Sequence, residues 1–292
     1  MPLAAEITMA APAKINLFLR VLARRPDGYH EIETLMQKVE LADCVHIRLA
    51  KAGISLVCHG VDLACDAGNL VYRAAREFLQ AAGSHQGVDL TLEKRIPVAA
   101  GLGGGSSDAA AVLKGLNVLL GAGFSEDRLR EIGKTLGADV PFFVSERSAA
   151  RASGIGDILQ PAASMGACWI VLANPGFAVS TKWVYENFAL TTKGNPYKLG
   201  RLPRHGGGRS PGRGVHGGQF CNDLESVTLP RHPEVGAMKE ELLADGATMA
   251  LMTGSGPTVF GIFHDAKQAV ASKDTMMRRH GGQVLVTRPL PA

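Results

Sequence analysis

The sequence predicts an α+β fold of two domains, and three observations carry that prediction. Strand-like and helix-like segments are mixed, without the regular alternation that builds a doubly wound parallel sheet. The 292 residues suffice for one large domain or two modest ones. An apolar run at 168–172 is typical of a buried strand that opens a second half. We therefore place the domain boundary near residue 160, with an N-terminal domain over 1–160 and a C-terminal domain over 161–292.

The first part of the chain predicts β-strands. Apolar side chains alternate along 15–21 and again along 45–49, which is the period of a half-buried strand. Between them, Arg-Pro-Asp-Gly at 25–28 predicts a turn, because proline presets one dihedral angle and glycine accepts a positive φ. A further strand is predicted over 88–92.

Helices are predicted where apolar residues recur every three or four positions. Asn69 can cap a helix that continues to Gly83, and two more helices are predicted over 106–120 and 125–136. For the second half we expect a helix over 233–245, strands over 247–252 and 257–263, and a last helix and strand.

The composition is that of an ordinary folded protein. Hydrophobic residues make up 46% and charged residues 20%, which argues against a disordered chain, collagen or a coiled coil. No apolar run approaches the roughly 18 residues of a membrane span, and no positive cluster precedes an apolar core near Met1. We expect a soluble, cytoplasmic protein without a secretory signal.

The basic charge comes from one segment. Residues 191–218 hold six lysines and arginines and no acid, so without them the formal net charge of +4 becomes −2. Nine of those 28 residues are glycine, and such a segment buries too little apolar surface to offset its ordering entropy. We expect a flexible surface insert. Nonspecific phosphate binding by this insert is an alternative, but Tyr197 is its one aromatic residue and offers no stacking platform.

The five cysteines suggest no metal site. Their number is odd, they form no Cys-x-x-Cys pair, and the closest spacing, Cys58 to Cys65, has no second pair to complete a zinc site. We expect reduced, mostly buried thiols and no dedicated metal ligands.

The strongest local signal is the glycine-rich stretch at 97–110, PVAAGLGGGSSDAA. Glycines let the backbone approach a ligand, and the N-terminus of the following helix favours an anion such as phosphate. The stretch is neither a Walker A loop nor the dinucleotide fingerprint. Asp108 would repel a phosphate unless it turns away or faces a metal ion, and the sequence does not decide between these.

This stretch resembles the phosphate loop of the GHMP kinases, the group of galactokinase, homoserine kinase and mevalonate kinase. PAKINL at 12–17 and GSGPTVF at 254–260 match the same group, so the resemblance spans nearly the whole chain except 191–218. It implies a small-molecule kinase with a two-domain GHMP kinase fold and its active site in the cleft between the domains. ATP would be the phosphate donor, with Mg²⁺ arriving on it, held largely by phosphate oxygens and water. The loop residues implied to bind ATP are Pro97, Ala100, Gly101, Leu102, Gly103, Gly104, Gly105, Ser106 and Ser107.

Four further stretches narrow the resemblance: RPDGYH at 25–30, GADVPFF at 137–143, ASGIGD at 152–157 and NDLE at 222–225. They resemble those GHMP kinases that phosphorylate the 2-hydroxyl of a cytidine-diphosphate-linked methylerythritol in the non-mevalonate isoprenoid pathway. The alternatives are a homoserine or mevalonate type of GHMP kinase, a nucleic-acid-binding protein that uses the basic insert, or an inactive nucleotide sensor. We expect no membrane and no specific nucleic-acid partner, and the oligomeric state, monomer or homodimer, stays open.

The resemblance also assigns roles to single residues. It implies Asp139 as the general base and Lys14 as the cation that lowers the acceptor's pKa and stabilises developing charge. Asn16, two residues beyond Lys14, points to the same sheet face and is a candidate for orienting substrate or phosphate. The residues implied to bind substrate are Asn16, Tyr29, His30, Asp139, Thr181 and Tyr185, with Tyr29 and His30 on the cytosine and Tyr185 closing the stack from the second domain. Trp183 or Phe188 could replace Tyr185, and Thr181 could merely cap a helix.

Overall fold

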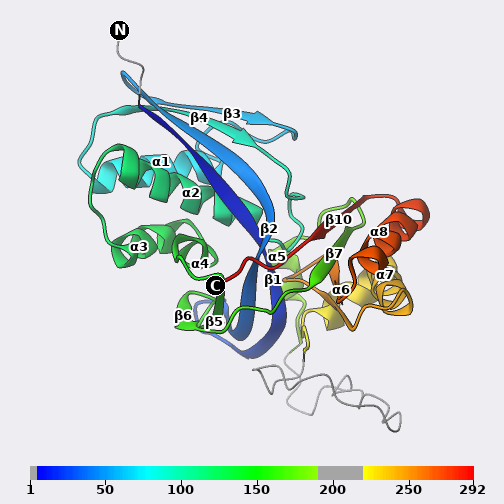
Figure 1. The fold of residues 1–292 in the computed structure, drawn as a ribbon. Coiled ribbons are helices and arrows are strands. Elements are labelled where there is room, and N and C mark those ends of the chain that lie inside the picture. The colour runs from blue at the N-terminus through cyan, green and yellow to red at the C-terminus, as the bar shows by residue number, and fades with distance from the viewer. Residues whose placement is uncertain (1–4, 190–219) are drawn as a thin grey trace.

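The computed structural model describes residues 5–189 and 220–292, so the predicted insert over 191–218 lies outside the described residues. Two β-sheets, each covered by helices, lie side by side and form the two halves of the molecule (Figure 1). The mixed order of strands and helices confirms the predicted α+β class. None of the described helices is long and apolar enough to cross a membrane.

The first sheet has six strands and is built around one long hairpin. Its strands are β1 (Glu6–Arg24), β2 (His30–Ala50), β3 (Ile54–His59), β4 (Gly87–Glu93), β5 (Ala149–Ser153) and β6 (Ile158–Pro161), in the order β3-β4-β2-β5-β6, with β1 paired to β2. All pairs are antiparallel except β3 with β4. The turn predicted at 25–28 joins β1 to β2, and Gly28 supplies its positive φ of 88°.

Four helices cover one face of this sheet: α1 (Leu70–Ala81), α2 (Gly104–Leu119), α3 (Glu126–Leu136) and α4 (Val140–Val144). Asn69 caps α1 as predicted, because its side-chain oxygen accepts the N–H of Val71 at 2.9 Å. Helix α2 begins two residues before the predicted start at Ser106. The sequence did not predict α4, because five consecutive apolar residues show no helical period.

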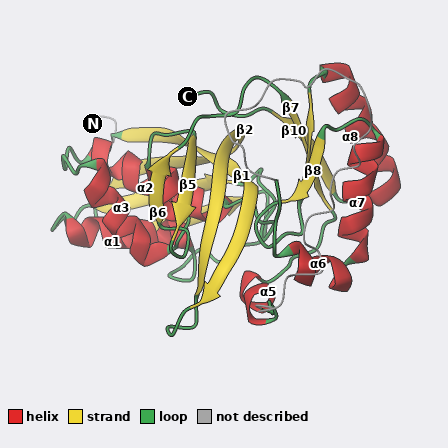
Figure 2. Cartoon of the chain, turned by 90° about the horizontal axis from the view of Figure 1, so that it is seen from below, coloured by secondary structure: helices red, strands yellow, loops and turns green. Residues whose placement is uncertain are grey.

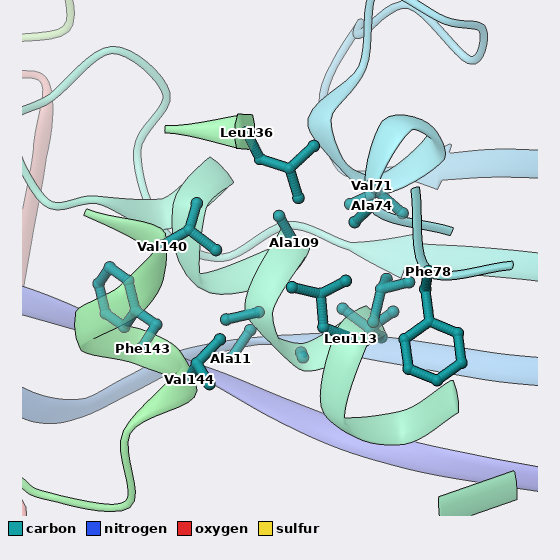
Figure 3. Packing of buried hydrophobic residues seen from close by; sticks show 14 of the residues in the cluster. Ala11, Val71, Ala74, Phe78, Ala109, Leu113, Leu136, Val140, Phe143 and Val144 are labelled. Carbon is teal, nitrogen blue, oxygen red and sulfur yellow. The ribbon is translucent and has the colours of Figure 1, made fainter. Parts of the chain in front are cut away.

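The helices and the sheet enclose an apolar core, shown close up in Figure 3. Phe78 of α1, Leu113 of α2 and Val140 of α4 are fully buried there. Phe143 lies in the same cluster beneath the start of α2, so the core supports the glycine-rich loop from below.

The second sheet has four strands, all antiparallel, in the order β10-β7-β9-β8. They are β7 (Trp169–Asn174), β8 (Met249–Met252), β9 (Val259–Phe263) and β10 (Gln283–Thr287), and they confirm the strands predicted for this half. Helices α7 (Pro233–Ala244) and α8 (Ala266–His280) pack against it, while the short α5 (Thr181–Glu186) and α6 (Glu225–Arg231) lie near the hairpin (Figure 2).

The β1–β2 hairpin joins the two halves. Its residues Leu19, Val21 and Ile32 belong to the apolar cluster of the second sheet and its helices. In return, the chain beyond β10 pairs with β2: the N–H of Glu40 donates to the carbonyl of Arg288 at 2.9 Å. Packing therefore crosses the boundary placed near residue 160, which stays a prediction.

Candidate active site

A cavity of about 1060 Å³ opens where the two halves meet. The cavity is lined by residues of the hairpin, of the glycine-rich loop before α2, of α5 and of the 253–256 loop. Of the site residues predicted from the sequence, the cavity brings together Lys14, Asn16, Tyr29, His30, Pro97, Ala100, Gly101, Gly103, Gly104, Gly105, Ser106, Asp139, Thr181 and Tyr185. Leu102 and Ser107 are buried beside it and do not line it.

The glycine-rich loop presents free backbone N–H groups to the cavity. Gly103 precedes α2 with a left-handed φ of 71°, and no side chain caps the helix. The N–H groups of Gly104, Gly105 and Ser106 therefore have no intrahelical acceptor. Together with the helix dipole they form an anion-binding site of the kind that phosphate occupies. Ala99 adds a positive φ of 51°, a strained value for a residue with a Cβ, at the start of the loop.

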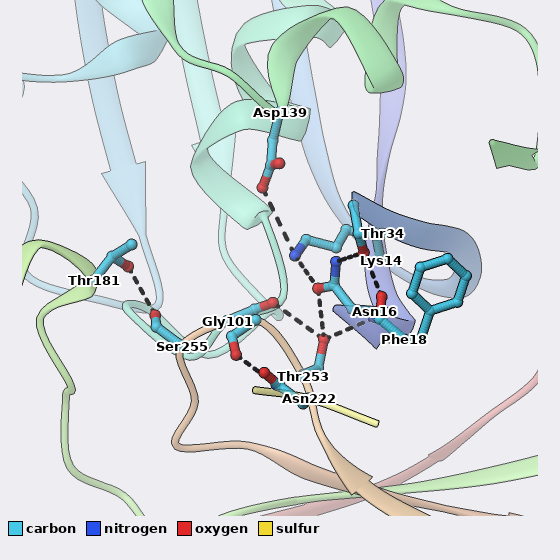
Figure 4. Close-up of polar contacts among 11 residues, drawn as sticks. Lys14, Asn16, Phe18, Thr34, Gly101, Asp139, Thr181, Asn222, Thr253 and Ser255 are labelled. Atoms are coloured by element: carbon cyan, nitrogen blue, oxygen red, sulfur yellow. Dashed lines mark hydrogen bonds and ion pairs between the residues drawn. The ribbon is translucent and has the colours of Figure 1, made fainter. Parts of the chain in front are cut away.

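The loop at 253–256 packs directly on the glycine-rich loop. A Cβ on Gly101 would overlap the carbonyl oxygen of Thr253, so the two backbones approach as closely as only glycine permits. The Thr253 hydroxyl accepts the N–H of Asn16 at 3.0 Å and lies 3.3 Å from the carbonyl of Gly101 (Figure 4). The three separate stretches that carried the sequence resemblance thus meet at Thr253.

Lys14 and Asn16 point to the same face of β1, as predicted. The Lys14 ammonium donates to the Asn16 side-chain oxygen at 2.6 Å and lies 3.7 Å from Asp139 Oδ2 (Figure 4). Asn16 Nδ2 donates in turn to Thr34 on β2 at 2.8 Å. The Lys14 side chain is 5% exposed and that of Asp139 is 34% exposed. A buried cation is thus held in one place, beside a carboxylate that a ligand in the cavity can reach.

Asp139 stands at the start of α4, but its side chain makes no capping hydrogen bond. The carboxylate is therefore not used to cap this helix. Its position follows from the apolar run after it, since Val140, Phe142 and Phe143 are buried and fix the backbone of α4 in the core. The carboxylate is left facing the cavity.

Aromatic side chains gather at the other end of the cavity. His30 is buried at the start of β2, and its ring lies 5.3 Å from that of Tyr185 on α5, with an interplanar angle of 30°. Phe188 meets His30 edge-on at 6.4 Å, but neither Phe188 nor Trp183 lines the cavity. Tyr29 precedes His30 and is 61% exposed. Tyr29 and His30 from the hairpin and Tyr185 from α5 thus line the cavity with rings from both halves.

The chemistry of these rings is set by burial. Burial lowers the pKa of His30, and the positive charge of Arg24 acts in the same direction, so the imidazole is neutral at pH 7. A neutral imidazole both donates and accepts a hydrogen bond. Burial raises the pKa of the Tyr185 phenol, with a smaller contribution from Asp139, so that hydroxyl stays protonated.

Thr181 is not a helix cap. Ser180 caps α5, because its hydroxyl accepts the N–H of Trp183 at 3.3 Å. The Thr181 hydroxyl instead lies 2.8 Å from that of Ser255, which comes from the 253–256 loop. This pair of hydroxyls closes the cavity on the side of the second sheet.

Asp108 lines the cavity and is paired with Lys94, an arrangement that neither of the two alternatives left open by the sequence included. Its Oδ2 accepts a hydrogen bond from the Lys94 ammonium at 2.8 Å, and Lys94 also pairs with Asp43. Asp43 further accepts the backbone N–H groups of Arg95 and Ile96, at 2.6 and 2.8 Å. This buried cluster of Asp43, Lys94 and Asp108 ties β2, the end of β4 and the N-terminal half of α2 together.

Two carboxylates compete for one ammonium in that cluster. The pKa of Asp108 is raised to about 7, because burial and, to a smaller extent, the charge of Asp43 outweigh the opposing charge of Lys94. The pKa of Lys94 is raised, since the two carboxylates outweigh the effect of its burial. Among the described residues, Asp108 Oδ1 and Ser107 Oγ are buried without any hydrogen-bond partner.

Comparison with known proteins decides the family. The GHMP kinases N terminal domain matches residues 69–147 and the GHMP kinases C terminal domain matches residues 205–281. A 4-diphosphocytidyl-2-C-methyl-D-erythritol kinase from Geobacter sulfurreducens is 47% identical over 279 residues, covering 94% of this chain and 96% of that protein. The chain belongs to the 4-diphosphocytidyl-2-C-methyl-D-erythritol kinase family of GHMP kinases. It is a small-molecule kinase.

Solved GHMP kinases share this architecture. A 4-(cytidine 5'-diphospho)-2C-methyl-D-erythritol kinase superimposes with a TM-score of 0.80 at 36% identity, over 98% of this chain and all of that one. A homoserine kinase from Cytophaga hutchinsonii reaches a TM-score of 0.67 at 19% identity, over 97% of this chain and 94% of its own, and shows the shared fold alone. The two-domain GHMP kinase fold predicted from the sequence is confirmed.

Sequence reasoning missed several residues that hold this GHMP kinase site together. Asn222 donates to the carbonyls of Met252 and Gly254 at 2.8 and 2.7 Å and so fixes the 253–256 loop. It lies in the matched stretch NDLE, which was a signal, although its role was not assigned. Thr34 and Asp43 gave no signal, because a lone polar residue in a strand does not reveal what faces it across the sheet.

Proposed function

We propose that this protein transfers the γ-phosphate of ATP to the 2-hydroxyl of 4-diphosphocytidyl-2-C-methyl-D-erythritol, which gives the 2-phosphate and ADP. In this proposal it serves the non-mevalonate route to isoprenoid precursors, in the cytoplasm. The observation that carries the proposal is the arrangement along one cavity: free N–H groups before α2, the Lys14–Asp139 pair, and the aromatic rings of His30 and Tyr185. The names of the relatives at high identity support the same acceptor.

In this reaction Asp139 is the general base. Its carboxylate lies in the cavity, is not used for capping, and can take the proton of the attacking hydroxyl. Lys14 lies 3.7 Å away and favours the developing alkoxide and the charge on the transferring group. Asn16 holds the Lys14 ammonium in place through its side-chain oxygen and can orient the acceptor. Phosphoryl transfer asks mainly for such positioning and charge stabilisation.

The glycine-rich loop would hold the phosphates of ATP. The backbone N–H groups of Gly104, Gly105 and Ser106 supply the donors, and Pro97, Ala100, Gly101 and Gly103 shape the path of the loop around them. Leu102 acts through its backbone, because its carbonyl accepts the N–H of Lys14 at 2.9 Å.

Mg²⁺ would arrive with ATP and neutralise phosphate charge. The partly exposed carboxylate of Asp139 lines the cavity and offers an oxygen ligand that suits this cation. Few direct protein ligands are thus at hand, in keeping with an ion held mainly by phosphates and water.

The cytosine would bind between rings. Tyr29 stacks on the base from the hairpin and Tyr185 closes the stack from α5, while the neutral His30 hydrogen-bonds the edge of the base. Thr181, paired with Ser255, would contact the substrate where the second sheet approaches it. A homoserine or mevalonate type of kinase has no need for these rings, which is why we favour a cytidylated acceptor.

The deciding experiment measures ADP release from ATP and Mg²⁺ with one acceptor at a time. The cytidylated methylerythritol, homoserine, mevalonate and galactose serve as separate acceptors. We expect turnover with the first alone. Turnover with another acceptor would keep the roles of the glycine-rich loop and Asp139 but discard the cytosine pocket. ATP binding without any turnover would favour the inactive nucleotide sensor, and a steep salt dependence of nucleic-acid binding would favour a role for the basic insert.

A further inference from the structure

Away from the cavity, three side chains of metal-ligating type converge on the outer face of the first sheet. They are Cys44, His46 and Glu93. Cys44 and His46 lie two positions apart on β2 and therefore share a face, opposite to the one that Val45 and Ile47 bury in the core. Glu93 ends β4, and its Cα pairs with that of Cys44 across the sheet. The strand register, rather than any sequence spacing, brings the three together.

The distances between their ligand atoms fit one ion. Cys44 Sγ lies 3.6 Å from His46 Nε2, and His46 Nε2 lies 3.4 Å from Glu93 Oε1. All three atoms lie within 4.8 Å of one another. Zinc bonds of about 2.3 Å to sulfur and 2.0–2.2 Å to nitrogen or oxygen, at tetrahedral angles, put neighbouring ligand atoms about 3.4–3.6 Å apart. The distances from His46 Nε2 to Cys44 Sγ and to Glu93 Oε1 already lie in that range.

A residue from a third strand fixes the histidine. Thr8 of β1 pairs with His46, and its hydroxyl lies 2.8 Å from His46 Nδ1. The Thr8 hydroxyl can accept a hydrogen bond from Nδ1–H, and this tautomer leaves the lone pair of Nε2 free toward Cys44 and Glu93. Metal-binding histidines have such a partner on the second ring nitrogen, because it sets the tautomer and the ring orientation.

We propose that Cys44, His46 and Glu93 bind a borderline-soft divalent cation such as Zn²⁺, with Cys44 Sγ, His46 Nε2 and Glu93 Oε1 as ligands and water in the fourth position. A thiolate, an imidazole and a carboxylate together select zinc-like ions over Mg²⁺ or Ca²⁺, which take oxygen ligands. All three side chains are partly exposed, so the ion enters without a rearrangement of the core. Arg95, 3.7 Å from the other Glu93 oxygen, leaves Oε1 available.

The position of this site gives it a structural consequence. Asp43 and Lys94, the next residues along β2 and β4, meet on the inner face of the sheet and hold the backbone that leads into the glycine-rich loop. An ion on the outer face would join the same two strands at the same point. It would brace the sheet directly behind that loop.

The test uses the full-length protein, stripped of metal, kept reduced and titrated with Co²⁺. We expect saturation at one ion per chain, with a thiolate-to-cobalt charge-transfer band and the intense d–d bands of a tetrahedral site, both removed by Zn²⁺. Cys44→Ser should abolish the charge-transfer band, and Cys44→Ser, His46→Gln and Glu93→Gln should each weaken binding at least about tenfold. Zn²⁺ should raise the melting temperature of the wild type but not of Cys44→Ser.

Cys65→Ser is the matched control, because Cys65 is exposed and lies outside the cluster. It should bind Co²⁺ as the wild type does. Thr8→Val removes only the hydroxyl that holds His46, and it should weaken Co²⁺ binding by about tenfold or more. Thr8→Ser keeps a hydroxyl and should bind Co²⁺ as the wild type does. ADP release by each variant confirms that it is folded. The proposal is overturned if Co²⁺ gives no thiolate band, or if the band survives Cys44→Ser and disappears in Cys65→Ser.

Discussion

The ring of His30 lies 5.3 Å from the ring of Tyr185, although the two residues come from opposite halves of the molecule. His30 begins β2 at the tip of the long hairpin, and Tyr185 lies on α5 of the second half. The tip of the hairpin therefore brings His30 into contact with α5 of the second half. Neither half builds this part of the site alone.

Tyr185→Ala should raise KM for the cytidylated substrate and leave KM for ATP unchanged. Stacking of a base on an aromatic ring contributes about 1–3 kcal/mol, so we expect a rise of roughly five- to 150-fold. Steady-state kinetics with each substrate varied in turn measures both constants. Tyr185→Phe keeps the ring and should stay near the wild type, as should Trp183→Phe outside the cavity. An equal rise in both KM values would remove Tyr185 from base recognition.

Asp139→Asn should lower kcat by about 10²–10⁴-fold, the range that general acid–base catalysis contributes. The isosteric amide keeps the shape of the α4 start but cannot accept the proton of the acceptor hydroxyl. Binding of a non-hydrolysable ATP analogue, measured by calorimetry, should stay within a few-fold of the wild type. A kcat near that of the wild type would show that the proton goes elsewhere.

Gly101→Ala should destabilise the fold, whereas Gly105→Ala should not. The new Cβ at 101 meets the Thr253 carbonyl and is strained by a φ of 77°, which together cost at least about 1–3 kcal/mol. At 105, inside α2, a Cβ finds ordinary contact with Leu70 at 3.5 Å, and alanine favours a helix by about 0.5–1 kcal/mol. Urea denaturation of the two variants measures the difference. Equal midpoints would contradict the close approach of the two loops.

Asp108→Asn should change how stability depends on pH. The folded protein raises the pKa of this carboxyl from 3.8 to about 7, so between those values the folded state holds a proton that the unfolded state releases. The contribution of Asp108 to stability is therefore full below about pH 4 and is lost as the pH rises through 7. Asparagine has no such proton, and Lys94 keeps Asp43 as its partner.

Melting temperatures of both proteins at pH 5 and pH 8 test this sign. From pH 5 to pH 8 the melting temperature of the variant should rise relative to that of the wild type. The size of this relative rise should not depend on substrate. Leu113→Val, a core change in the same helix, serves as the control and should shift both temperatures alike. An unchanged difference between the two melting temperatures from pH 5 to pH 8 would show that Asp108 ionises as easily in the folded protein as in the unfolded chain.

The sequence alone was enough for elements whose ends are decided locally. Helix α1 was predicted because Asn69 caps it and an apolar face follows, and both are properties of neighbouring residues. Helix α4 was missed, because VPFFV becomes a helix only when the core buries all five residues. Contacts such as Asp43 with Lys94, or Cys44 with Glu93, depend on which strands pair and in which register, and no single strand contains that information. The placement of Asp139 beside Lys14 was predicted through resemblance to a family.

The hairpin departs from a regular ladder at the site itself. Its register shifts between Pro12 and Lys14 and again between Asn16 and Phe18, on either side of the residues that face Asp139. Bulges are the points where a strand bends, while the regular segments of β1 and β2 run stiffly into both halves. Two bends of β1 therefore fall on either side of Lys14 and Asn16. A change in the bend of the hairpin at these shifts would therefore move Lys14, the cation that we propose stabilises the transferring group, relative to Asp139.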